Sequence, residues 1–137
     1  MRGRLDEVMV FPGLPEVFKK LQANGYKLHI LSSNSTENVR TYISQQGLTD
    51  NFESINGGVG LFGKKRAIRK LCKIYDTPLE RVWYVGDEVR DVVAAKKAGV
   101  KVVAVGWGFN HQKALTQAGP DILVMTPTEL VKAIIEK

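Results

Sequence analysis

The chain has 137 residues, of which 44% are hydrophobic and 25% charged, and this balance is typical of one compact globular domain. No apolar run approaches the roughly 18 residues that a membrane span needs, and the N-terminus lacks the apolar segment of a signal peptide. The single cysteine, Cys72, excludes an internal disulfide. We therefore expect a cytoplasmic protein with one domain over residues 1–137 and no membrane partner.

The net charge of +6 comes from one segment. Six cations lie between Lys64 and Lys73, and the 14 basic residues elsewhere equal the 14 acidic ones in number. A phosphate-facing patch, a nucleic-acid contact and a solvated helix face all remain open for this run. Because the rest of the chain is neutral, we expect no nucleic-acid partner.

Apolar strands alternate with helices along the chain. The predicted strands cover 27–31, 52–55, 82–85, 100–105 and 122–125, and Gly25, Gly47 and Gly99 end the helices between them. Asn34 with Glu37, and Thr126 with Glu129, have the spacing of capping boxes. The apolar run 82–85 predicts a strand covered on both faces. This alternation predicts an α/β fold, a Rossmann-like and mainly parallel sheet with helices on both faces, whose ligands bind beyond the carboxyl ends of the strands.

Two carboxylates follow the strand 82–85. Gly86 permits a sharp turn that brings Asp87 to the edge of the sheet, and Asp91 lies one helical turn further on. Clustered carboxylates at a strand end suit Mg²⁺. The alternative is that Asp87 only caps the following helix.

The strand 27–31 ends in Ser32, Ser33 and Asn34 before a helix. Small hydroxyl residues and free helix amides form a phosphate cradle, although the same residues are common in ordinary turns. Lys64 and Lys65 begin the basic helix, where a cation opposes the helix dipole, and this suggests that they hold an anion. The Gly-rich segment 57–63 lacks the Gly-Lys-Ser/Thr of a nucleotide-triphosphatase loop.

Taken in order, Ser32-Ser33-Asn34, Lys64 and Gly86-Asp87-x-x-x-Asp91 resemble the later motifs of the haloacid dehalogenase superfamily. The runs from Ala94 to Val100 and from Val105 to Phe109 are similar to its phosphoglycolate-phosphatase-like branch. The resemblance implies that Ser32, Ser33 and Asn34 bind the phosphoryl group, and that Lys64, with Lys65 as second choice, neutralises its charge. It also implies that Asp87 ligates Mg²⁺ and that Asp91 contributes to the metal site or orients the lysine.

The chain departs from this family at the nucleophile, which is the first Asp of an Asp-x-Asp motif on a central strand. No two aspartates here are two residues apart; they stand at positions 6, 50, 76, 87, 91 and 121. We therefore interpret the chain as a core incomplete at its N-terminus, with 1–11 as a remnant of the connection from a cap domain. Without the central strand, the strands 27–31 and 82–85 expose unpaired edges, which predicts self-association or completion by a missing N-terminal segment.

Two functions remain open. The first is a Mg²⁺-dependent phosphatase, or the C-terminal portion of one, that hydrolyses a small phosphorylated metabolite. The second is a catalytically inactive pseudo-phosphatase that binds phosphate, metal or a protein partner. Activity of this chain alone stays uncertain, because it contains no counterpart of the nucleophile.

Overall fold

The computed structural model describes residues 14–60, 63–106 and 112–135. The chain divides into two compact units, Met1–Leu61 and Phe62–Lys137. One domain over 1–137 stays a prediction. None of the helices in the described ranges is long and apolar enough to cross a membrane.

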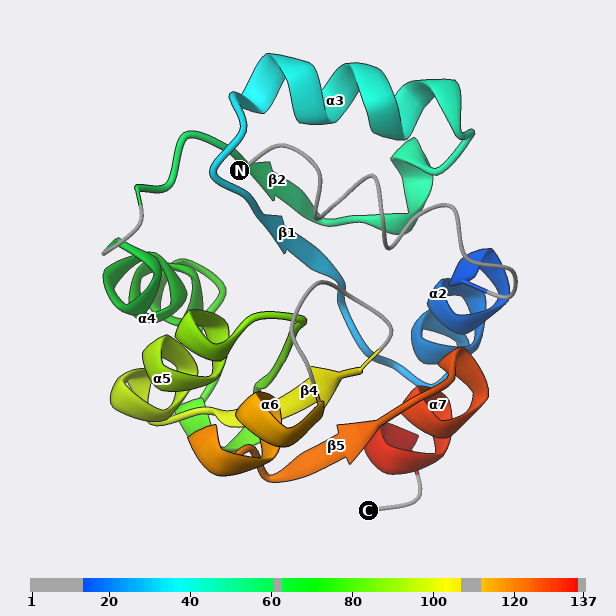
Figure 1. Cartoon of the computed structure of the whole chain (residues 1–137). Coiled ribbons are helices and arrows are strands. Elements are labelled where there is room, and N and C mark those ends of the chain that lie inside the picture. The colour runs from blue at the N-terminus through cyan, green and yellow to red at the C-terminus, as the bar shows by residue number, and fades with distance from the viewer. Residues whose placement is uncertain (1–13, 61–62, 107–111, 136–137) are drawn as a thin grey trace. The chain divides into compact units, whose positions relative to one another are not determined.

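The first unit has two parallel strands, β1 and β2, together with the helices α2 and α3 (Figure 1). Strand β1 pairs with β2 so that His29 lies opposite Ser54 and Leu31 opposite Asn56. Ile30 of β1 packs in one apolar cluster with Val39 and Ile43 of the following helix. In chain order, the elements are α2 (Leu14–Ala23), β1 (His29–Leu31), α3 (Thr36–Gln45), η1 (Thr49–Asn51) and β2 (Ser54–Asn56).

The second unit has three parallel strands in the order β3-β4-β5 (Figure 1). The middle strand is buried from Val102 to Val105, as expected for a strand with a neighbour on each side. In chain order, the elements are α4 (Lys64–Ile74), η2 (Leu79–Arg81), β3 (Trp83–Gly86), α5 (Val89–Ala98), β4 (Lys101–Val105), α6 (Gln112–Ala118), β5 (Ile122–Val124) and α7 (Pro127–Ile135).

The predicted α/β class with parallel strands is confirmed, since every strand pair in the described ranges is parallel. The prediction that residues 82–85 form a strand covered on both faces is wrong, because the Val85 side chain is 41% exposed. Among the described strands β3 pairs only with β4. One edge of β3 therefore has no partner among the described strands, as expected for an edge strand and not for a central one.

The helix starts were predicted with mixed success. Thr126 and Glu129 form the expected capping box at α7. The Thr126 hydroxyl accepts a hydrogen bond from the Glu129 amide at 3.2 Å, and a Glu129 carboxylate oxygen accepts one from the Thr126 amide at 3.1 Å. The predicted cap at Asn34 is wrong. Ser35 caps α3 instead, and its hydroxyl accepts from the Asn38 amide at 3.1 Å. The backbone of Asn34 is still in the preceding turn, where its carbonyl accepts from the Gly58 amide.

Candidate functional site

Three carboxylates follow β3 in the second unit. Asp87 is 1% exposed and Asp91 is fully buried, while Glu88 between them is partly buried. Single ligand oxygens of Asp87, Glu88 and Asp91 all lie within 4.8 Å of one another. The sequence therefore predicted the two buried members of this cluster, Asp87 and Asp91, and missed Glu88.

Gly86 has a second role beyond the turn that the sequence suggested. A Cβ atom added at Gly86 would lie 2.5 Å from the Asp91 Cβ and 2.8 Å from Asp91 Oδ2. These separations are far below van der Waals contact, so any side chain at this position would displace the carboxylate of Asp91. The glycine at the end of β3 therefore makes room for Asp91 in the interior.

The helix-cap interpretation of Asp87 is wrong, because Glu88 is the N-cap residue of α5. The Asp91 carboxylate accepts a hydrogen bond from the Glu88 amide at 3.2 Å through Oδ2. Glu88 and Asp91, on the C-terminal side of Asp87, therefore cap α5. The burial of Asp87 needs another explanation, since a buried carboxylate is costly and is retained where it is paired or holds a cation.

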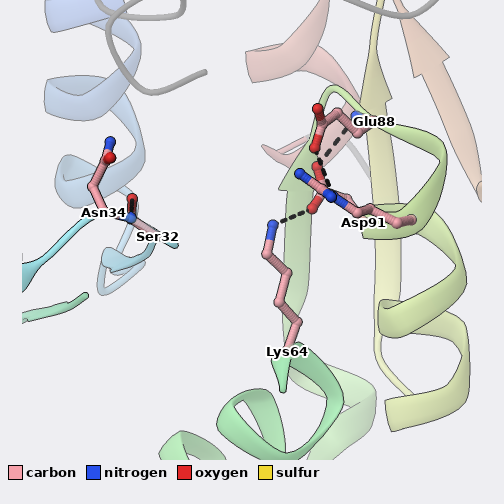
Figure 2. Close-up of polar contacts among 6 residues, drawn as sticks. Ser32, Asn34, Lys64, Glu88 and Asp91 are labelled. Atoms are coloured by element: carbon pink, nitrogen blue, oxygen red, sulfur yellow. Dashed lines mark hydrogen bonds and ion pairs between the residues drawn. The ribbon is translucent and has the colours of Figure 1, made fainter. Parts of the chain in front are cut away.

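Lys64 lies in the interior although it begins the basic helix α4. Its side chain is turned onto Asp91, with Nζ 2.5 Å from Asp91 Oδ1, and Figure 2 shows this ion pair beside Glu88. Lys64 is 3% exposed, whereas Lys65 is exposed to solvent. The structure therefore favours Lys64 over Lys65 as the lysine associated with the carboxylates.

The donor set at the end of β3 fits a hard divalent cation, because all the candidate ligand atoms are carboxylate oxygens. Asp91 uses Oδ1 for Lys64 and Oδ2 for the Glu88 amide. Glu88 accepts a hydrogen bond from Arg90 Nε at 3.0 Å. Asp87 is the main candidate ligand because its carboxylate is buried directly after β3, and Asp91 is placed to fix the position of Lys64.

The Ser32–Asn34 turn belongs to the first unit, where it follows β1. Ser32 is 4% exposed, and its hydroxyl accepts a hydrogen bond from the Asn34 amide at 3.1 Å. Ser33 and Asn34 are partly buried. The structure thus gathers these three predicted phosphate ligands in one turn, which is shown with Ser32 and Asn34 as sticks in Figure 2.

The Gly-rich segment holds this turn in place, a role that the sequence did not reveal. The Gly58 amide donates to the Asn34 carbonyl at 2.6 Å, and the Val59 amide donates to the Ser32 carbonyl at 3.0 Å. The Gly57 amide donates to Thr36 Oγ1 at 3.0 Å, and a Cβ at Gly57 would lie only 2.2 Å from the Thr36 amide nitrogen. Two backbone segments therefore touch at Gly57, and only glycine fits there.

The described residues also include one histidine, His29, and the single cysteine, Cys72. His29 Nδ1 lies 2.6 Å from the Ser54 hydroxyl on the neighbouring strand, and burial lowers the pKa of His29. Burial raises the pKa of the Cys72 thiol, which disfavours the reactive thiolate. His111 lies outside the described residues.

Comparison with known proteins identifies the family of the chain. The family model described as "Haloacid dehalogenase-like hydrolase" matches residues 2–105. The chain belongs to this family of haloacid dehalogenase-like hydrolases, which confirms the resemblance found in the sequence.

Among curated relatives, a phosphoglycolate phosphatase of Synechococcus elongatus is 38% identical over 132 residues, which cover 96% of this chain and 62% of the relative. A phosphoglycolate phosphatase of Pseudomonas fluorescens is 30% identical, with 93% of this chain and 48% of the relative covered. The chain thus spans between about half and three fifths of the length of these relatives.

Solved structures show the same fold. A protein from Clostridium acetobutylicum, reported as a predicted phosphatase, superposes with a TM-score of 0.85 at 24% identity. It matches 93% of this chain, which covers 60% of that structure. A predicted phosphoglycolate phosphatase from Haemophilus somnus gives a TM-score of 0.82 at 25% identity, with 90% and 56% covered.

Proposed function

We propose that this chain provides the lysine, the serine and the metal-binding carboxylates of a Mg²⁺-dependent phosphatase that acts on a small phosphorylated metabolite. The observation that carries the proposal is the buried Lys64–Asp91 ion pair beside Asp87. Phosphoryl transfer depends mainly on positioning and on stabilising negative charge, and fixed cations in a protein interior provide both. The curated relatives named above as phosphoglycolate phosphatases support a small phosphomonoester as the substrate class.

Each residue has a role that its surroundings support. Lys64, fixed by Asp91, offers an ammonium group that neutralises a transferring phosphoryl group. The Ser32 hydroxyl and the amides of the same turn donate hydrogen bonds to phosphate oxygens. Asp87 would hold Mg²⁺, with Glu88 nearby, and the bound ion would supply positive charge opposite the phosphoryl oxygens. Ser33 and Asn34 complete the phosphate ligands.

The covalent nucleophile has no counterpart in this chain, because none of its aspartates forms an Asp-x-Asp motif. Turnover therefore needs a carboxylate from outside these 137 residues. Among the described strands, β3 pairs with β4 alone, and an edge strand can pair with a further strand through its backbone amide and carbonyl groups. We propose that a strand carrying the nucleophile completes the protein at such an edge.

Metal binding provides the first test. Isothermal titration of the chain with Mg²⁺ should show binding that weakens at least tenfold in Asp87→Asn. The matched control is Asp50→Asn, which removes one exposed carboxylate from the first unit and should leave the affinity unchanged. Equal affinities of the Asp87→Asn variant and the parent chain would contradict the assignment of the metal ligand.

Turnover provides the second test. The chain alone should show no Mg²⁺-dependent hydrolysis of an aryl phosphate above background, because loss of a covalent nucleophile removes several orders of magnitude of rate. A separately expressed segment with an apolar strand and Asp-x-Asp should restore hydrolysis, and Asn in place of its first Asp should abolish it. Hydrolysis by the unaided chain that Asp87→Ala removes would refute the nucleophile argument. Failure to restore it, with Mg²⁺ and phosphate still bound, would favour the inactive pseudo-phosphatase.

A further inference from the structure

The exposed face of α4 carries most of the excess charge of the chain, and the phosphatase residues do not account for it. Of the six cations in this segment only Lys64 is buried. The exposed members are Lys65, Arg66, Arg69, Lys70 and Lys73. The helix contains no acidic residue, and no side chain caps its start.

These exposed cations repel one another, and no ion pair between described residues compensates them. Lys65 and Arg69 are four residues apart, as are Arg69 and Lys73, and like charges at this spacing destabilise a helix. Within the described ranges, the ion pairs join Lys64 to Asp91 and Arg90 to Glu88, so neither involves the exposed face of α4. A helix that is merely solvated usually intersperses glutamates with its lysines, and this helix does not.

Part of the face forms a concave site. A pocket of about 480 Å³ is lined by Gly63, Lys65, Arg66 and Arg69, and we call it the α4 basic pocket. This volume is in the range of sites for small molecules, about 300–1,000 Å³. Among the described residues that line it, Lys65, Arg66 and Arg69 are cations, so this part of the pocket is suited to an anion.

Arg69 is held in position at this pocket. Its Nε donates to the Ala98 carbonyl at 3.2 Å, and one terminal nitrogen donates to the Lys97 carbonyl at 3.1 Å, both at the end of α5. These contacts use two of the five N–H donors of the guanidinium. A fixed guanidinium with donors remaining loses less side-chain entropy on binding phosphate than a mobile one.

We propose that the α4 basic pocket binds a small polyanion that carries two or more phosphate groups. Three cations around one concavity match a multiply charged ligand better than a single phosphate, and arginine binds phosphate through paired N–H donors. The pocket favours a compact ligand over nucleic acid, which binds along an extended basic surface. The proposal is independent of the phosphatase function, because the Lys64 side chain is turned onto Asp91 and does not line the pocket.

The experiment titrates the full chain with tripolyphosphate, pyrophosphate and orthophosphate, and follows binding by calorimetry. Tripolyphosphate should bind most tightly. Arg66→Gln and Lys65→Gln should each weaken it about tenfold, whereas Lys113→Gln on exposed α6 should change it by less than twofold. Arg69→Gln serves as a further variant, and thermal unfolding of each protein shows whether it remains folded.

A second set of measurements distinguishes binding at the α4 basic pocket from phosphate binding at the Ser32–Asn34 turn, and polyphosphate from other classes of ligand. Ser32→Ala should weaken orthophosphate binding and leave tripolyphosphate binding to the pocket unchanged. If Lys113→Gln and Arg66→Gln weaken tripolyphosphate binding equally, the ligand responds only to the overall positive charge of the chain, and the proposal is overturned. Absence of tripolyphosphate binding, or tighter binding of a 12-nucleotide single strand than of tripolyphosphate, would also overturn it.

Discussion

Replacing Asp91 by asparagine removes the charge that offsets Lys64 in the interior of the second unit. Lys64 and Asp91 have side chains that are 4% and 0% exposed, and their charged atoms are 2.5 Å apart. Removal of one partner from a buried pair leaves the other charge uncompensated and costs about 3–5 kcal/mol. We therefore expect Asp91→Asn and Lys64→Met each to lower the free energy of unfolding by about this amount, a large part of the roughly 5–15 kcal/mol available to a domain.

Urea denaturation followed by circular dichroism measures the effect. With a slope of about 2 kcal/mol/M, the midpoint should fall by about 1.5–2.5 M for each single variant. The double variant Lys64→Met/Asp91→Asn contains no buried charge at this pair and should be more stable than either single variant. Single losses below about 1 kcal/mol, or a double variant whose loss equals the sum of the single losses, would refute the reasoning.

Three further variants test other parts of the chain by the same denaturation method. Gly57→Ala should cost about 1–3 kcal/mol because its Cβ would overlap backbone, whereas Gly60→Ala, with open space around it, should cost little. His29 has a lowered pKa when folded, so the unfolded chain binds more protons below about pH 6.5, its unfolded-state value. Stability should fall as the pH drops through this value, and His29→Gln should flatten the dependence. Thr126→Ala should cost about 1 kcal/mol by removing the hydrogen bond to the Glu129 amide. A flat pH profile for the parent chain, or unchanged midpoints for the Gly57 and Thr126 variants, would contradict these expectations.

Local signals in the sequence predicted much of the fold and the buried members of the site. Gly99 adopts a positive φ at the end of α5, as a helix stop requires, and the Thr126 capping box is present. Asp87 and Asp91 are buried where the strand-turn-helix pattern placed them. Each of these features depends on a few consecutive residues, so it can be predicted from the sequence alone.

Features that depend on distant contacts could not be read in this way. The choice of Lys64 over Lys65 follows from the ion pair with Asp91, 27 residues away. The exposure of Val85 depends on which elements pack against the faces of β3, and its apolar sequence carries no such information. Ser35 caps α3 in place of Asn34, whose carbonyl accepts a hydrogen bond from the Gly58 amide, 24 residues further along the chain.

The contact at Gly57 also predicts which positions of this segment can vary among orthologues. Val59 holds the Ser32 carbonyl through its backbone amide, and any residue except proline supplies that donor. Gly57 has no such freedom, because the Thr36 backbone occupies the space of a side chain. Among orthologues, position 59 should therefore drift widely, while position 57 stays glycine and position 36 keeps a hydroxyl to receive its amide.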